Sequence, residues 1–173
     1  RDPEAGTKAL RILLNRRGYD SRIRTGCYTI HSDATPMQVA DMLTSGSQTP
    51  VKVTVNSTRT LGQMIRSLSS QLMADSIQIA SRLENPAFLD SLGYTPATVF
   101  CMIIPNTYEF YWNTSVDALI NRLVKERDRF WNDQRKSKAR EIGLTEQQVI
   151  TLASIVEEET SKSDELAVVA GLY

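Results

Sequence analysis

Residues 145–160 form the stretch that most restricts how this chain can fold. Thr145 and Gln148 have the spacing of a capping box, in which each side chain binds the backbone amide of the other residue and fixes the start of a helix. Apolar residues then recur at helical spacing, at Val149, Leu152, Ile155 and Val156. The stretch predicts an amphipathic helix that packs against a core.

Three glutamates close this predicted helix, and the apolar stripe, when continued, reaches the last of them, Glu159. Glu157 and Glu158 are expected on the two flanks. Desolvation raises the pKa of a carboxyl group, and a raised pKa suits a general acid near neutral pH. The alternative is that the helix emerges into water and all three acids are solvated, which is the commoner arrangement. Spacing alone leaves both interpretations open.

Composition excludes several classes of function. Lys+Arg and Asp+Glu number 20 each, so the net charge is zero and no nucleic-acid partner is expected. His31 is the sole histidine, and Cys27 and Cys101 lie in no paired motif, so we expect neither a metal site nor a cofactor. The two cysteines fit either a disulfide or two free thiols. No apolar run is long enough to span a membrane, and no signal-peptide pattern is present.

The N-terminal third predicts a small mixed unit, and the chain as a whole an α+β fold. A helix is expected within residues 6–19, ending at Gly18. A strand at 27–30, a helix from Thr35 to Gly46 and a strand at 51–55 should then form a compact strand–helix–strand module.

The middle of the chain is expected to be mostly helical. Amphipathic helices are predicted at 60–72 and from Asp75 to Leu83, followed by a short one ending at Gly93. An apolar run at 99–104 precedes residues 106–112, which gather aromatic and polar side chains able to hold a sugar ring. Such aromatics more often fill a core, and this alternative stays open.

One long helix is expected from Ser115 to about Lys138, bracing the helix at 145–160. The basic run 135–140 admits two interpretations, an anion-binding patch or a solvated helix end, and the second is the commoner. A further helix is expected to start at Asp164.

Residues 152–160 read Leu-Ala-Ser-Ile-Val-Glu-Glu-Glu-Thr, which resembles the Ala-Ser-Ile-Val-Glu-Lys-Glu-Thr signature of the MltG (YceG-like) endolytic peptidoglycan transglycosylases. The last glutamate of that signature is catalytic in the family and falls on Glu159. Residues 105–110 are similar to the family's Pro-Asp-Thr-Tyr-x-Phe, with Asn106 in place of aspartate. By this resemblance Asn106, Tyr108 and Glu165 are candidate substrate-binding residues.

The resemblance also implies a division of the chain. Residues 1–19 would be an N-terminal helical segment, 20–56 a LysM-like α/β module, and 57–173 a helix-rich partial catalytic domain whose C-terminal half lies outside this sequence. An N-terminal membrane anchor would also lie outside it. These residues alone are then expected to be inactive.

The function implied by the resemblance is that of a lyase, a murein lytic transglycosylase. It would cleave the glycosidic bond between N-acetylmuramic acid and N-acetylglucosamine and leave 1,6-anhydro ends during cell-wall assembly and glycan chain termination. The implied partners are peptidoglycan strands and, further, cell-wall synthases. The implied location is the bacterial inner membrane, with this region facing the periplasm.

Two other classes of function stay open. A lysozyme-like hydrolase would need a second carboxyl group, from Glu165, Glu157 or Glu109. A non-enzymatic peptidoglycan-binding or scaffold protein would instead function through the LysM-like module. None of these is an obvious second catalytic acid. This slightly favours the transglycosylase, because there an intramolecular nucleophile takes the place of the second carboxyl group.

Overall fold

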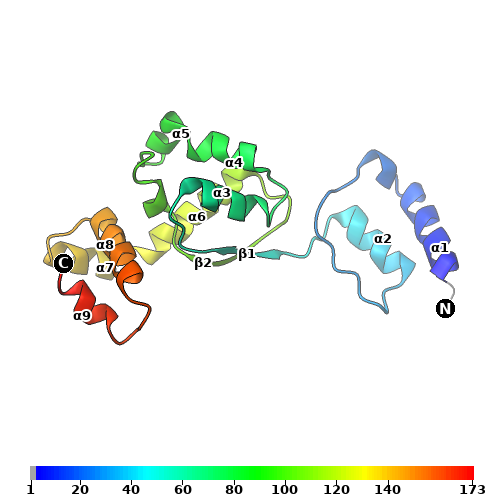
Figure 1. The fold of residues 1–173 in the computed structure, drawn as a ribbon. Helices are drawn as coiled ribbons and strands as arrows, with labels where there is room; N and C mark the ends of the chain where they lie inside the picture. The colour runs from blue at the N-terminus through cyan, green and yellow to red at the C-terminus, as the bar shows by residue number, and fades with distance from the viewer. Residues whose placement is uncertain (1–2) are drawn as a thin grey trace.

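The structure, a computed structural model, describes residues 3–173. Within that range it is helix-rich with one small sheet, an α+β fold (Figure 1). The elements in chain order are α1 (Pro3–Arg16), η1 (Tyr19–Ser21), α2 (Pro36–Ser45), β1 (Val51–Val55), α3 (Leu61–Ser69), α4 (Ser76–Leu83), α5 (Pro86–Ser91), η2 (Val99–Met102), β2 (Asn106–Phe110), α6 (Val116–Phe130), α7 (Asp133–Glu141), α8 (Glu146–Glu159) and α9 (Leu166–Ala170).

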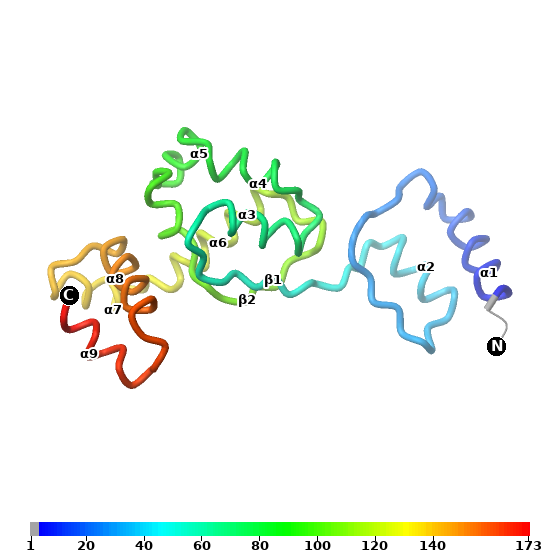
Figure 2. The backbone as a smooth tube through the Cα atoms, in the orientation of Figure 1, coloured from blue at the N-terminus to red at the C-terminus, as the bar shows by residue number. Residues whose placement is uncertain are grey.

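These elements form three groups along an elongated molecule (Figures 1 and 2). The N-terminal helix pair, α1 and α2, lies at one end. The central body, residues 51–130, contains both strands and the helices α3 to α6. The C-terminal helices α7 to α9 lie at the other end, so α1 and α9 are far apart. The candidate site on α8 is therefore remote from the N-terminal helix pair.

The two strands pair antiparallel although they are distant in the sequence, with Val53 opposite Tyr108. Burial alternates along both strands, so that Val53, Val55, Tyr108 and Phe110 face the core. On the other face, the hydroxyl groups of Thr54 and Thr107 are 3.0 Å apart. The strand predicted at 51–55 is confirmed. The strand at 106–110 was not predicted.

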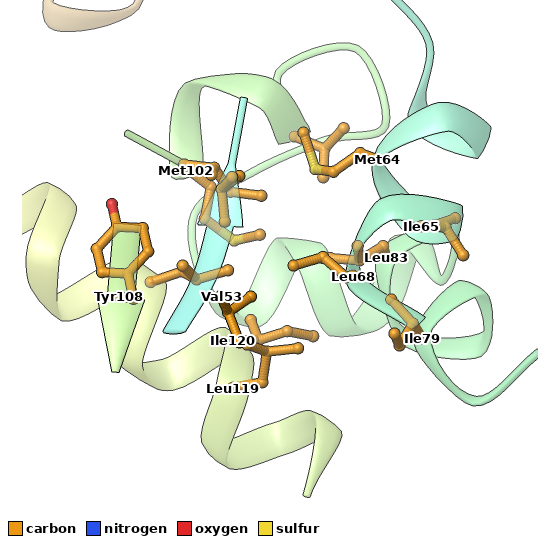
Figure 3. Close-up of a cluster of buried hydrophobic side chains, with 14 of the residues drawn as sticks. Val53, Met64, Ile65, Leu68, Ile79, Leu83, Met102, Tyr108, Leu119 and Ile120 are labelled. Carbon is orange, nitrogen blue, oxygen red and sulfur yellow. The ribbon is translucent and has the colours of Figure 1, made fainter. Parts of the chain in front are cut away.

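The hydrophobic core lies in the central body, between the sheet and the helices. Figure 3 shows Val53 among the side chains of Leu68, Leu119 and Ile120. The apolar run 99–104 is buried as expected and includes the short helix η2. Most buried residues of the described chain belong to this one cluster, so the central body holds the fold together.

Local sequence signals explain where most helices begin. Capping boxes start α2, α4 and α8, at Thr35, Asp75 and Thr145 respectively. A single side-chain cap from Thr60 starts α3. Gly46 ends α2 with a φ of 72°, a conformation that glycine adopts without strain. These helix starts agree with the predictions.

The strand expected at 27–30 is wrong. That segment carries no strand pairing. It contacts Thr49 through two hydrogen bonds, from Thr49 N to Cys27 O at 2.8 Å and from Thr29 N to Thr49 Oγ1 at 3.1 Å. The partner of β1 is β2 instead, and Ile30 is exposed, so burial gives 27–30 no reason to join a sheet. The strand–helix–strand arrangement expected of a LysM-like module is not confirmed, because β1 belongs to the sheet of the central body.

The single long helix expected at 116–138 is also wrong, because the chain breaks between α6 and α7. Trp131 leaves helical geometry and is buried, with its ring edge-on to Phe130. Asn132 then caps α7, accepting a bond of 3.0 Å from Arg135 N. The capping bond and the burial of Trp131 together favour two helices over one.

One asparagine joins the N-terminal helix pair to the central body. Asn113, just after β2, donates from its amide to Thr25 O at 2.8 Å. Its carbonyl oxygen accepts from Gln48 Nε2 at 3.1 Å. These bonds connect the segments before and after α2 to Asn113, just after β2. The side chain of Asn113 therefore helps to fix the orientation of α1 and α2 relative to the central body.

Both cysteines are free thiols, and Cys101 lies in the core, where burial raises its pKa.

Within residues 3–173, every helix is too short or too polar to cross a membrane.

We predict that Leu68→Ala lowers the free energy of unfolding by about 2–5 kcal/mol, because Leu68 is 1% exposed and its loss leaves a cavity. Urea unfolding followed by circular dichroism measures the effect. Ile77→Ala is the control, since Ile77 is 79% exposed and should change stability by about 0.5 kcal/mol or less. Equal losses in the two variants would contradict the assigned core.

Candidate functional site

The candidate site lies at the C-terminal end of α8. The helix packs by a narrow face in which Val156 is buried, at 6% exposure, and Ile150 contacts the core of the central body. Val149 and Leu152 are half-buried, but Ile155 is exposed. The apolar stripe is therefore present but fades before the last turn.

The inward direction expected for Glu159 is wrong within the described chain. Glu157, Glu158 and Glu159 are all exposed, and Glu159 is the last residue of α8. Val156 is the last buried residue of the apolar stripe on α8. The described residues therefore place no apolar surface over Glu157, Glu158 and Glu159. The described residues thus do not shield Glu159 from water. A role for Glu159 as a general acid depends on a ligand that covers the end of α8.

Each of the three glutamates has a partner from another segment. Ser57 Oγ donates to Glu157 Oε2 at 3.0 Å, Arg59 forms an ion pair with Glu158, and Tyr173 Oη donates to Glu159 Oε1 at 3.2 Å. Carboxylates are unfavourable at a helix C-terminus, where the helix dipole is negative. These donors offset part of that repulsion. The charge of Glu159 and its hydrogen bond also raise the pKa of the Tyr173 hydroxyl.

A polar hollow of about 470 Å³ lies beside Glu157. We call it the amide hollow, because the side chains of Asn56 and Asn106 line it together with Ser57 and Thr107. The carbonyl oxygen of Asn106 accepts from Thr107 N at 2.8 Å, which leaves its NH₂ group without an acceptor among the described residues. Amides, hydroxyls and one carboxylate can hydrogen-bond the hydroxyl and acetamido groups of a sugar.

Tyr108 does not belong to this hollow. Its side chain is 5% exposed, its ring packs 6.3 Å from that of Phe110, and its hydroxyl donates to Ile104 O. Burial raises its pKa. A ring in this position cannot present its face to a sugar, so the core interpretation holds for Tyr108 and Phe110. The exposed aromatics of the segment are Tyr111 and Trp112.

Glu165 lies just before α9 and is held by neighbours. Its carboxylate accepts from Lys162 Nζ and from Thr160 Oγ1, both at 2.8 Å. These hydrogen bonds, the one from Lys162 foremost, lower the pKa of Glu165 from its ordinary value of 4.5. Glu165 therefore remains ionised at neutral pH and suits binding or base chemistry better than acid chemistry.

Comparison with known proteins identifies the family. The model of the YceG-like family matches residues 4–173, nearly the whole chain. The chain belongs to the YceG-like family. A crystal structure of a yceG-like protein from Listeria monocytogenes shares the fold, with a TM-score of 0.61 at 17% sequence identity. That alignment covers 88% of this chain and 56% of the Listeria protein. No match was found among curated proteins.

In this YceG-like chain the four candidate residues occupy four different places. Asn106 shares the amide hollow with Glu157, Glu159 faces Tyr173, and Glu165 lies beside Thr160 at the start of the turn into α9. Tyr108 is in the core. Within residues 3–173, no group of three potential metal ligands is placed to hold an ion.

Ser57 and Arg59 were missed by the sequence analysis, and so was the strand that brings Asn106 to the site. A signal for that strand was present, since apolar Tyr108 and Phe110 alternate with polar neighbours at a period of two. The partners Ser57 and Arg59 had no such signal, because they lie a hundred residues from the acids that they bind.

We predict that Lys162→Gln raises the pKa of Glu165 toward 4.5, because the variant removes the charged donor. Titration of the side-chain carboxyl carbon by NMR measures this shift. Since the pKa is depressed in the folded chain, the stability that this contact contributes is present above pH 4.5 and is lost as the pH falls through the lower, folded-state pKa. Lys138→Gln on α7 is the control; a matching shift in that variant would rule out the specific contact.

Proposed function

We propose that this chain is part of an endolytic lytic transglycosylase of the MltG kind, a lyase that cleaves peptidoglycan between N-acetylmuramic acid and N-acetylglucosamine. Membership of the YceG-like family over residues 4–173 carries the proposal. Supporting it, the signature of residues 152–160 forms the last turns of α8, and its final glutamate, Glu159, is open to a large substrate.

In the proposed reaction Glu159 acts first as acid and then as base. The protonated carboxyl group donates to the glycosidic oxygen as the bond from that oxygen to muramoyl C1 breaks. The muramoyl 6-hydroxyl oxygen attacks C1, and the carboxylate of Glu159 takes the proton of that hydroxyl. The products are a free 4-hydroxyl on N-acetylglucosamine and a 1,6-anhydro ring. No water is consumed, so one carboxyl group suffices.

The exposure of Glu159 places a condition on this mechanism. The first step needs a protonated carboxyl group, and the described residues do not cover Glu159, so the ligand that covers it must favour that form. A glycan strand lying over the end of α8 would exclude water from Glu159 and displace Tyr173 Oη, its hydrogen-bond donor. Both changes favour the protonated form.

The amide hollow is the proposed contact for a neighbouring sugar. Glu157 and Glu159 are two residues apart on α8 and therefore point to roughly opposite flanks. A strand that crosses the end of the helix can reach both flanks, with Asn56 and Asn106 binding acetamido or hydroxyl groups on the Glu157 side. The hollow would thus fix the position of the strand while Glu159 carries out the chemistry.

The proposed setting is the bacterial cell wall. The substrate is the peptidoglycan strand, with cell-wall synthases as further partners, and the region faces the periplasm from an inner-membrane anchor outside this sequence. The chain spans little more than half the length of the yceG-like protein from Listeria monocytogenes. Tests of cleavage therefore require the full-length protein.

A lysozyme-like hydrolase is the second candidate, and the state of Glu165 is the observation in its favour. Its lowered pKa keeps this carboxylate charged, as a base that activates water or a nucleophile must be. Hydrolysis would leave reducing muramoyl ends without an anhydro ring, so the product distinguishes the two reactions.

We predict that Glu159→Gln in the full-length protein lowers glycan cleavage by roughly 10²–10⁴-fold or more, because it removes the proton donor and acceptor. Mass spectrometry of digested glycan strands measures the anhydro-muramoyl ends. Glu158→Gln is the matched control, since this neighbour is also exposed and pairs with Arg59. Anhydro ends that persist at full yield in Glu159→Gln would refute the assignment, and reducing ends from the wild type would select the hydrolase.

We predict that Asn56→Ala with Asn106→Ala weakens glycan binding about thirtyfold, on the basis of roughly 1 kcal/mol for each of two lost hydrogen bonds. The test uses the inactive Glu159→Gln form and a short N-acetylglucosamine oligomer, with binding followed by NMR. Gln134→Ala, an exposed amide on α7, is the control. Unchanged affinity in the double variant would remove the amide hollow from the site.

A further inference from the structure

A second hollow, of about 690 Å³, lies where α6, α7 and the start of α8 meet. We call it the basic hollow, because its charged lining residues are Arg127, Lys136, Arg140 and Glu146. Two positive charges are in excess among the lining residues, and one if Asp128, which binds Arg127 from outside the hollow, is counted, although the chain as a whole is neutral. A concave surface of one sign concentrates its field and attracts ligands of the opposite charge.

The basic run of α7 divides between this hollow and open solvent. Lys136 and Arg140 line the hollow, one turn apart, whereas Arg135 stacks over the ring of Phe130 at 4.2 Å and Lys138 is exposed elsewhere on the helix. The hollow also gathers Arg127 from α6, so its cations come from two helices.

The hydrogen-bonding capacity of these cations is only partly used. Glu146 accepts from Arg127 Nη2 and lies 3.8 Å from Lys136 Nζ, and Arg127 Nη1 donates to Asp128 at 3.1 Å. Arg127 Nε is buried and has no acceptor among residues 3–173. Arg140 donates from Nε to the backbone oxygen of Lys136, and no carboxylate of the described chain pairs with its guanidinium group. Donors therefore remain available to a ligand.

Arg127 is also held in place before any ligand arrives. Its side chain is 15% exposed, two carboxylates bind it, and its guanidinium carbon lies 6.0 Å from the ring centre of Tyr94. A guanidinium group that is already ordered loses little conformational entropy on binding, which favours affinity for an oxyanion.

We propose that the basic hollow is a binding site for an oxyanion group, a carboxylate or a phosphate, carried by a ligand of the protein. The forked donors of Arg140 would bind two of its oxygens, and Lys136 and Arg127 would neutralise its charge. Glu146 holds Arg127 and Lys136 at the hollow. The site is separate from the proposed catalytic end, because Glu146 and Glu159 lie at opposite ends of a helix about 20 Å long.

The test titrates inorganic phosphate and, separately, acetate into the full-length protein at low salt, with binding followed by amide chemical shifts and calorimetry. We expect saturable binding of at least one probe, weakened about tenfold or more in Lys136→Gln with Arg140→Gln. Lys138→Gln, with the same charge change per residue on the same helix, should bind like the wild type. A response to phosphate alone would identify a phosphate source, and a response to acetate a carboxylate source.

Arg140→Lys supplies the second variant, since it keeps the charge but loses the fork, and should weaken binding by several-fold without affecting the fold. Circular dichroism checks folding in each case. Absence of saturable binding by either probe, or equal weakening in Lys138→Gln, would overturn the proposal. Cleavage by Glu159 does not enter these measurements, so their result is independent of the proposed function.

Discussion

The antiparallel pairing of β1 with β2 is the constraint on which the remaining structure depends. It joins two segments that are far apart in the sequence, and its inner face supplies Val53 and Tyr108 to the core that α3, α4 and α6 cover. It also brings together the segments that extend from the strand ends, Asn56–Ser57 after β1 and Pro105 before β2, which line the amide hollow. A shift of register by one residue would turn the core residues outward and separate those walls.

The end of α8 concentrates negative charge where a helix tolerates it least. Three consecutive carboxylates lie at the negative end of the helix dipole, and hydroxyl and guanidinium groups from Ser57, Arg59 and Tyr173 bind them one by one. Stability alone gives no reason for such a cluster in the last turn. The proposed transglycosylase would require an accessible acid at the end of α8, and this requirement is a reason for the cluster.

Much of the fold could be predicted from local signals, and most of the errors have a common physical cause. Capping residues and periodic apolar positions located most helices, because these signals act within four or five residues. The strand partner of β1 and the exposure of Glu159 depend on contacts between distant segments, which periodicity does not encode. The break at Trp131 had a local signal, the capping residue Asn132, which the apolar periodicity of one long helix hid. The candidate acid was found through a family signature, and its surroundings were not, since apolar spacing at Val149 and Leu152 says nothing of where the stripe stops.

Asn113 also bears on how the N-terminal helix pair is oriented relative to the central body. Its carboxamide hydrogen-bonds across the junction between the N-terminal helix pair and the rest of the chain, and the hydrophobic core cluster lies in the central body, away from this junction. Swivelling about this point would leave the central body intact while carrying α1 and α2 through a wide arc. The distance from α1 to the end of α8 would then change with the orientation of the helix pair, which the bonds of Asn113 help to hold.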